Sequence, residues 1–256
     1  MSTAAMHDSI SANGNKNAYP RDVTERTAKM MLGFGIAAIV MMFGGLTSAV
    51  IVSKGGTFWV NFKLPSAFWI STAVIVFCSL VMNIAVMAIK RDKKALSRYM
   101  IILTFCGGIG FTVLQFIGYG QLVENGYYLS EKVIDPYSQK FHMKGEYGTD
   151  FTVQYKGEQL EYKNGLLYFQ NRTLTMPELN RLSEVMNTSS SYFYLLCFLH
   201  ILHLLGGLIY LMLVMFRSIQ NKFDSTNCLK IKLSAIYWHF LGLLWIYLFV
   251  FLQFIH

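Results

Sequence analysis

The sequence predicts an all-α integral membrane protein, a bundle of five transmembrane helices with a small mixed α/β insert outside the membrane between the third and fourth helices. Of its 256 residues, 54% are hydrophobic and only 14% are charged, whereas about a quarter of a soluble domain is charged. The charges are also segregated. Windows of at least 22 residues without Asp, Glu, Lys or Arg occur at 30–52, 68–89, 99–123, 191–216 and 233–255. About 20 apolar residues cross a membrane as a helix, so each window predicts one span.

We divide the chain into four segments. Residues 1–28 are mostly polar and predict a disordered cytoplasmic tail, and residues 29–123 hold the first three helices. Residues 124–190 form an external soluble insert, and residues 191–256 hold the last two helices. The first apolar run is too long for the core of a signal peptide, so we expect it to stay in the membrane.

Basic residues lie on one side of the predicted bundle. The tail, the second connection and the fourth connection together hold 13 Lys and Arg residues, against Lys54 and Lys63 in the short loop on the other side. The positive-inside rule therefore places the N-terminus inside and the C-terminus outside. The net charge of +8 reflects this topology. Because no soluble face interleaves basic and aromatic residues, we expect no nucleic-acid partner.

The insert is 67 residues long, more than a helix connection needs. Residues 161–169 predict two strands joined at Asn164-Gly165, a pair that tolerates the positive φ of a tight turn. Thr175 then predicts a helix cap, with Pro177 in the first turn.

Three histidines within the spans are the candidates for chemistry. His200 and His203 are three residues apart and share one helix face, and His239 lies on the next helix. A haem would need ligands from opposite sides, and a metal would need more ligands than imidazole alone. The alternative is that the rings form hydrogen bonds across helices and lock the packing, at about 1 kcal/mol per contact. No span contains the Asp or Glu that is typical of a proton relay or a cation path.

Four motifs resemble one known family, subunit III of the haem-copper oxidases (cytochrome c oxidase subunit III), over roughly residues 25–123 and 188–256. They occur in the same order and on the corresponding helices. The motifs are Tyr237-Trp238-His239-Phe240 with Trp245 in the last helix, His200 and His203 before Gly206 in the fourth, Gly110, Phe111, Gln115 and Tyr119 in the third, and Pro65 with Ser71-Thr72 in the second.

This resemblance implies a non-catalytic subunit of the short, five-helix form that supports assembly, lipid binding and sustained turnover of the catalytic subunit. It implies no catalytic residue, cofactor or metal in this chain, with haem and copper in partner subunits, and it implies oxidase subunits I and II and membrane lipid as partners. The membrane would be the inner (cytoplasmic) membrane of a bacterium, ahead of the mitochondrial inner membrane. The residues expected to contact lipid, a neighbouring subunit or one another are Thr72, Gln115, His200, His203, Tyr237, Trp238, His239 and Trp245.

The chain departs from the family pattern at three carboxylates. Where the family has a Glu in its first helix this chain reads Ala38-Ile39, and Gly118 and Gly242 replace a Glu and an Asp. A direct role in proton uptake is therefore not expected. Two alternatives stay open: a related component of a quinol oxidase or nitric oxide reductase, and a small b-type membrane cytochrome that uses His239 with His200 or His203.

The insert has two interpretations. It holds 9 acidic and 7 basic residues, and this near-neutral charge argues against electrostatic capture of a basic carrier. We expect instead a docking surface for another respiratory complex, an electron carrier or an accessory subunit. Its contacts would be exposed aromatic residues, since interface cores favour Tyr and Phe: Tyr147, Tyr155, Tyr162, Tyr168 and Phe169. The alternative is a self-contained cap over the outer end of the bundle.

Overall fold

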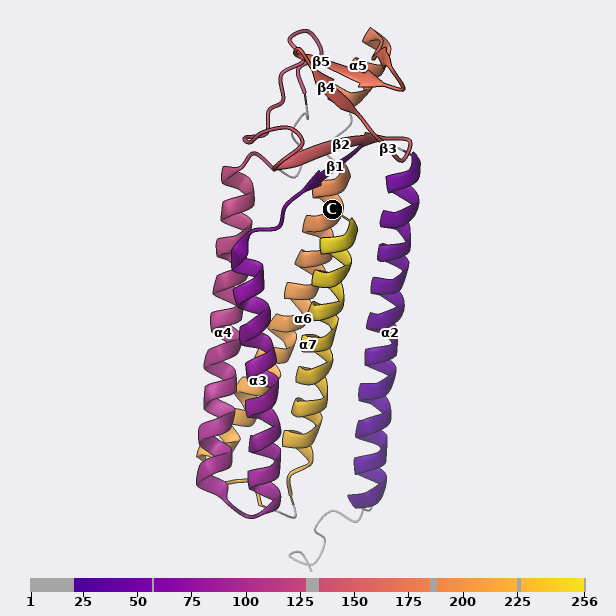
Figure 1. Cartoon of the computed structure of the whole chain (residues 1–256). Coiled ribbons are helices and arrows are strands. Elements are labelled where there is room, and N and C mark those ends of the chain that lie inside the picture. The colour runs from indigo at the N-terminus through magenta and orange to yellow at the C-terminus, as the bar shows by residue number, and fades with distance from the viewer. Residues whose placement is uncertain (1–20, 57, 128–133, 185–187, 225–226, 256) are drawn as a thin grey trace, which may run out of the picture.

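The computed structural model describes residues 21–56, 58–127, 134–184, 188–224 and 227–255. Five long apolar helices form a multi-pass membrane bundle, as the sequence predicts (Figure 1). They are α2 (Arg21–Gly56), α3 (Ser66–Lys90), α4 (Lys94–Glu124), α6 (Thr188–Ile219) and α7 (Leu229–Ile255). Helix α2 begins before the boundary that we expected, so residues 21–28 of the predicted tail are helical. Residues 1–20 lie outside the described residues.

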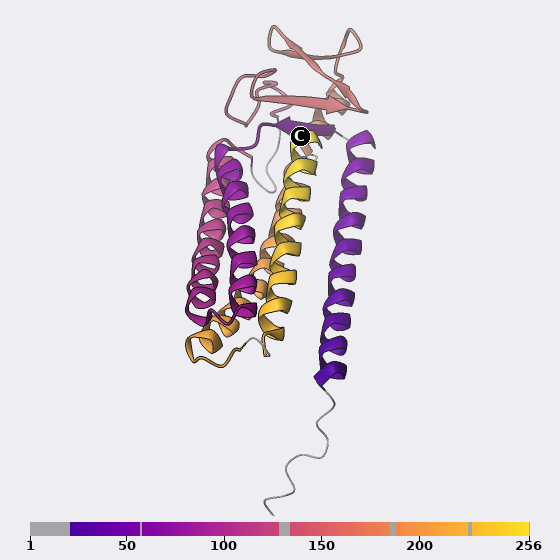
Figure 2. The ribbon, with the colours of Figure 1, turned by 60° about the horizontal axis from the view of Figure 1, so that its bottom comes forward.

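Helix α2 lies at the side of the bundle (Figures 1 and 2). Between residues 23 and 42 none of its residues is buried, and Phe43 is the first that is. Its second half is joined to the rest of the chain by side-chain hydrogen bonds: Thr47 with Tyr247, Ser53 with Tyr192, and Lys54 to the backbone oxygen of Ile255. Helix α2 is therefore anchored at the end of the bundle that carries the β-sheets.

Glycines allow the other helices to approach closely. A methyl group placed on Gly108 of α4 would lie 2.5 Å from Trp238 Cη2, and one on Gly207 of α6 would lie 2.7 Å from Leu241 Cδ1. The corresponding positions on α2, at Gly33 and Gly44, have no atom within 4 Å. The glycines of α4 and α6 thus allow these helices to pack closely against α7, as small residues do in membrane bundles. The glycines of α2 make no such contact.

Two small antiparallel sheets cover one end of the bundle (Figure 1). The first is β1 (Phe58–Phe62), β2 (Phe151–Tyr155) and β3 (Glu158–Gln159); the second is β4 (Glu161–Lys163), β5 (Leu166–Phe169) and β6 (Arg172–Thr173), followed by α5 (Met176–Glu184). The hairpin predicted at Asn164-Gly165 is present, with φ angles of 52° and 80°. Strand β1 was not predicted. It comes from the short loop after α2, and Val60 pairs with Val153 of the insert.

Strand β1 connects the sheets to the bundle below them. Trp59, Val60 and Phe62 are buried. The ring of Phe62 stacks on Tyr127 at 4.6 Å and meets the edge of Phe193, on α6, at 5.8 Å. The sheet that contains β1 is therefore packed on the bundle.

The expectation that the aromatic residues of the insert are exposed is wrong. Phe169 is buried, and Tyr147, Tyr155 and Tyr162 are partly buried and packed against the core. The Tyr147 hydroxyl donates a hydrogen bond to the backbone oxygen of Leu160. These rings form the interior of the insert, because two sheets this small must bury aromatic side chains to be stable.

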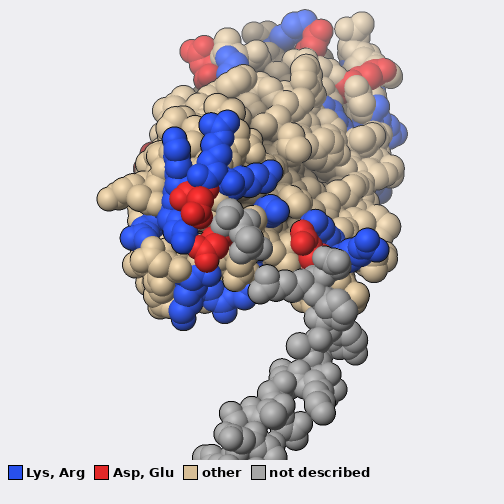
Figure 3. All heavy atoms as spheres, turned by 90° about the horizontal axis from the view of Figure 1, so that it is seen from below, with Lys and Arg blue, Asp and Glu red and all other residues tan. Residues whose placement is uncertain are grey.

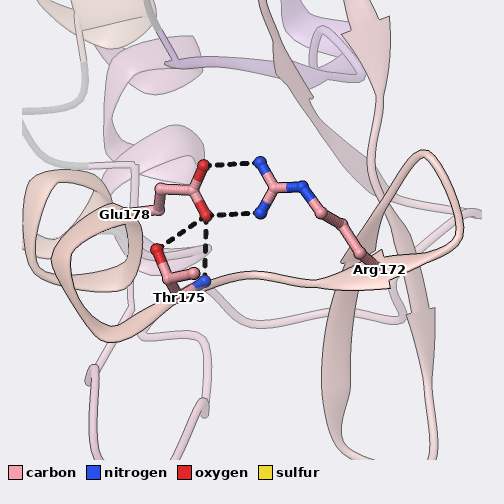
Figure 4. Close-up of polar contacts among 3 residues, drawn as sticks. All are labelled: Arg172, Thr175 and Glu178. Carbon is pink, nitrogen blue, oxygen red and sulfur yellow. Dashed lines mark hydrogen bonds and ion pairs between the residues drawn. The ribbon is translucent and has the colours of Figure 1, made fainter.

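The start of α5 is held by three side chains (Figure 4). Both oxygens of Glu178 accept hydrogen bonds from the Arg172 guanidinium, at 2.9 and 2.8 Å, and one of them also accepts from the backbone N–H and hydroxyl of Thr175. Arg172 and then Thr175 lower the pKa of Glu178 to about 2, so the carboxylate stays charged at physiological pH. This is the predicted cap, completed by a carboxylate that reaches back to the first residue.

The opposite end of the bundle is basic (Figure 3). The turn between α3 and α4 carries Lys90, Arg91, Lys93 and Lys94, and the connection from α6 to α7 meets it through Lys94 with Asp224 and Arg98 with Asn221. Lysine and arginine side chains gather here around a few acidic ones. The short basic connections thus share one end of the bundle, as the sequence predicts.

Candidate functional site

A chain of hydrogen bonds crosses the core of the bundle near its sheet end. The indole N–H of Trp245, on α7, donates to the Thr72 hydroxyl at 2.9 Å. The Gln115 amide, on α4, donates to the Ser71 hydroxyl at 3.0 Å. Both hydroxyls donate to the backbone oxygen of Phe68. Three of the predicted residues, Thr72, Gln115 and Trp245, are therefore brought together, and they join α3, α4 and α7.

Gln115 is bonded to partners on both sides of its amide. Gln115 is 0% exposed, yet its oxygen also accepts a hydrogen bond from the Tyr119 hydroxyl at 3.4 Å. An unpaired amide would be costly in a membrane interior. We conclude that these groups hold the three helices together.

His200 lies within an aromatic enclosure. It is 1% exposed, and its ring is 5.3 Å from that of Trp245 and 6.2 Å from that of Phe111. Its Nδ1 makes no hydrogen bond within the described part of the chain. The aromatic contacts position this ring, rather than the hydrogen bond that the sequence led us to expect.

The other two histidines face different helices. The Nδ1–H of His203 donates to the backbone oxygen of Leu199 on its own helix, and the ring packs on Phe43 of α2. His239, on α7, makes a 3.0 Å hydrogen bond from Nε2 to the Asn83 side chain of α3. The three imidazoles thus point toward three different neighbours. Among the described residues, no three His, Cys, Asp or Glu side chains form a group that could hold a metal ion.

Tyr237 and Trp238 belong to the same motif of α7 as His239, Tyr237-Trp238-His239-Phe240. The Tyr237 hydroxyl donates to the backbone oxygen of His203, at 3.3 Å, and so joins α7 to α6. Trp238 is buried, with its ring over Gly108 of α4. Tyr237, Trp238 and His239 therefore contact α6, α4 and α3 respectively, so α7 packs against all three of these helices.

Packing fills two of the positions where the family resemblance implies a carboxylate. A methyl group on Gly118 would lie 2.8 Å from Phe68 Cζ, and one on Gly242 would lie 3.2 Å from Ser79 Oγ. The ring of Phe68 occupies the space that a side chain at position 118 would need. The missing acids thus coincide with close contact between helices.

Sequence reasoning missed three residues of this site: Phe68, Ser71 and Asn83. Asn83 had a signal, because it is an amide within a 22-residue window that contains no charged residue and a polar side chain at such depth usually has a partner. Ser71 was part of the Ser71-Thr72 motif but was not expected to make a contact of its own, and Phe68 had no signal, since an aromatic residue at the start of a span fits many environments.

Two comparisons with known proteins point to the same family. The family model of cytochrome c oxidase subunit III matches residues 182–255, which include α6 and α7. Cytochrome c oxidase subunit 3 of Spodoptera frugiperda is 30% identical over 60 residues, which are 23% of this chain and 41% of that protein. The match therefore spans less than half the length of this relative.

Proposed function

We propose that this chain is the non-catalytic subunit III of a respiratory haem-copper oxidase, and the match of residues 182–255 to the family model of cytochrome c oxidase subunit III supports this. Its role is to support assembly, to bind lipid and to sustain turnover of the catalytic subunit. Oxidase subunits I and II are its proposed partners, and they carry the haem and copper. The same role would serve in a quinol oxidase or a nitric oxide reductase, which are the alternative complexes.

One observation carries this proposal: the polar residues of the matched segment are engaged in contacts between helices. Trp245 is bonded to Thr72 and His239 to Asn83, while Tyr237 is bonded to the backbone of α6. A proton or cation path would need an ionisable carboxylate along it, and the five uncharged windows of the sequence contain none. A small b-type cytochrome would need two opposed imidazoles, and the three rings face different neighbours. The arrangement favours a scaffold.

The charge distribution supports an orientation. The basic end of the bundle (Figure 3) would face the cytoplasm, and the sheets and the end of α7 would lie outside. We propose the cytoplasmic membrane of a bacterium as the setting, with the mitochondrial inner membrane as the alternative.

For the insert, the structure favours the cap over the docking surface. Its aromatic rings pack inward. Phe62 of β1 packs against Phe193 of α6 and so holds the first sheet on the bundle. A partner on the outer side, such as another respiratory complex or an electron carrier, would have to use other residues. The exposed ring of Tyr137, at a turn tip, is one candidate.

Deletion of this subunit from the oxidase is expected to shorten the working life of the enzyme more than it lowers the initial rate. The reason is that the five uncharged windows of the helices hold no carboxylate, so the chain contributes packing and lipid order and takes no part in proton transfer. Oxygen consumption is recorded over time for the purified enzyme with and without the subunit. Each recording gives the initial rate and the time over which activity is lost. An initial rate lowered about tenfold with a changed pH profile would contradict this role.

A further inference from the structure

Helices α3 and α7 present a shared outward surface, which we call the α3–α7 face. The two helices lie side by side in Figures 1 and 2, joined by the Thr72–Trp245 and Asn83–His239 hydrogen bonds. On α3 the face consists of exposed residues: Trp69, Ala73, Val76, Leu80, Asn83 and Met87. On α7 it consists of exposed or half-buried residues: Ile236, His239, Leu243, Ile246 and Val250.

The spacing of these residues is that of a helix-packing seam. On α3 they recur at alternating steps of four and three residues, and on α7 at steps of three and four. A repeat of 3.5 residues keeps one row of side chains facing a neighbouring helix along its whole length. Both rows contain large apolar side chains that are accessible near the middle of the row: Leu80 is 60% exposed and Leu243 is 66% exposed.

The polar pair within this face lies inside the membrane-spanning part of the two helices. Asn83 is seven residues from Lys90, and His239 is seven residues from Lys232. At 1.5 Å per residue, both lie about 10 Å from the charged end, inside a hydrocarbon core of about 30 Å. Their mutual hydrogen bond uses one nitrogen of His239 and the oxygen of Asn83. In the part of the chain that the structure describes, His239 Nδ1 and the Asn83 amide N–H groups make no hydrogen bond.

Lipid cannot satisfy these groups. Acyl chains carry no donor or acceptor, and an unsatisfied polar group is costly in hydrocarbon. A transmembrane helix can satisfy them with a Ser, Thr, Asn or Gln side chain, as neighbouring membrane helices do. A single polar position in an otherwise apolar row also fixes the register of helix pairing.

We propose that the α3–α7 face is the surface on which this chain receives a transmembrane helix of a neighbouring oxidase subunit, with Asn83 and His239 hydrogen-bonded to a polar side chain of that helix. The proposal rests on the proposed function, because it names the contact surface of the same subunit. It makes Asn83 and His239 positioning residues, which set the register of the incoming helix and have no part in the chemistry.

Photo-crosslinking in the intact complex tests the location of this surface. A benzophenone amino acid is placed at Leu80 or Leu243 on the face, and in control variants at Phe116 on α4 or Phe198 on α6, which are 60% and 63% exposed. Illumination of native membranes should join the first two positions to a haem-bearing or copper-bearing subunit that mass spectrometry identifies. The controls should give mainly lipid adducts.

Substitution of the polar pair tests its role. The double variant Asn83→Leu with His239→Leu should leave the complex about ten times faster in detergent, while His239→Gln, which keeps a hydrogen-bonding group, should restore most of the retention. Thr112→Val is the matched control, because the Thr112 hydroxyl bonds only to the backbone of its own helix. Retention is measured by native electrophoresis against time.

The outcomes separate this inference from the proposed function. Lipid adducts alone at Leu80 and Leu243, with oxidase subunits still co-purifying, would overturn the inference and leave the proposed function standing. Adducts with a second copy of this chain would also overturn it. If no haem-bearing subunit co-purifies with the unmodified protein, the proposed function itself fails.

Discussion

Replacing Gly118 with alanine is expected to destabilise the bundle by about 1–3 kcal/mol, the usual cost of overpacking a core. The added methyl group would lie 2.8 Å from Phe68 Cζ. Phe68 cannot move aside freely, because its ring is also packed against Tyr119, Phe193 and Trp245. Unfolding of the purified protein in mixed micelles of mild detergent and SDS measures the change.

Gly120→Ala is the matched control for this prediction. Gly120 lies on the same helix, but nothing is within 4 Å of a methyl group there, so alanine should stabilise α4 by up to about 1 kcal/mol. Gly118→Glu, which restores the acid of the family pattern, should be more damaging than alanine because it also buries a charge. Combining Gly118→Ala with Phe68→Leu should recover part of the loss. Equal effects of alanine at positions 118 and 120 would contradict the close contact.

Replacing Trp59 with alanine is expected to cost about 3–5 kcal/mol, as for other large aromatic residues in cores. Trp59 is 0% exposed and lies at the second position of β1, the strand that joins the sheets to the bundle. Hydrogen exchange should show loss of protection across β1 and its partner β2, and thermal unfolding should shift in parallel.

Trp69→Ala is the control, because it also removes an indole ring but leaves β1 unchanged. Trp69 is 58% exposed at the start of α3, so its removal should cost about 1 kcal/mol or less in the isolated protein. If Trp59→Ala leaves the exchange of β2 unchanged, the sheets do not depend on β1 and the cap interpretation fails.

The membrane spans and the local turns could be predicted from the sequence. Five uncharged windows predicted five helices, and Asn164-Gly165 and Thr175 predicted a hairpin and a cap, because each depends on residues close together in the chain. Strand β1 was missed although Phe58–Phe62 is rich in aromatic residues. Its partner is about 90 residues away, and no local pattern indicates a pairing that distant.

The sequence indicated several residues of the candidate site, but not the contacts that they make. Thr72, Gln115 and Trp245 meet, but the sequence could not show that His200 is held by rings or that His239 pairs with α3. Hydrogen-bond partners depend on how helices are rotated against one another, and a run of uniformly apolar residues does not encode that rotation. The inward packing of Phe169 and its neighbours was missed because it depends on how the two sheets and the bundle pack together, which no local pattern in the insert indicates.

Purification of the tagged chain from its native membrane tests the central claim most directly. In a mild detergent, the account predicts that a haem-bearing catalytic subunit co-elutes and shows its bands in a reduced-minus-oxidised spectrum, while the same chain expressed alone is colourless. A stoichiometric haem band on the chain expressed alone, abolished by His239→Ala, would contradict the account and make the chain a cytochrome.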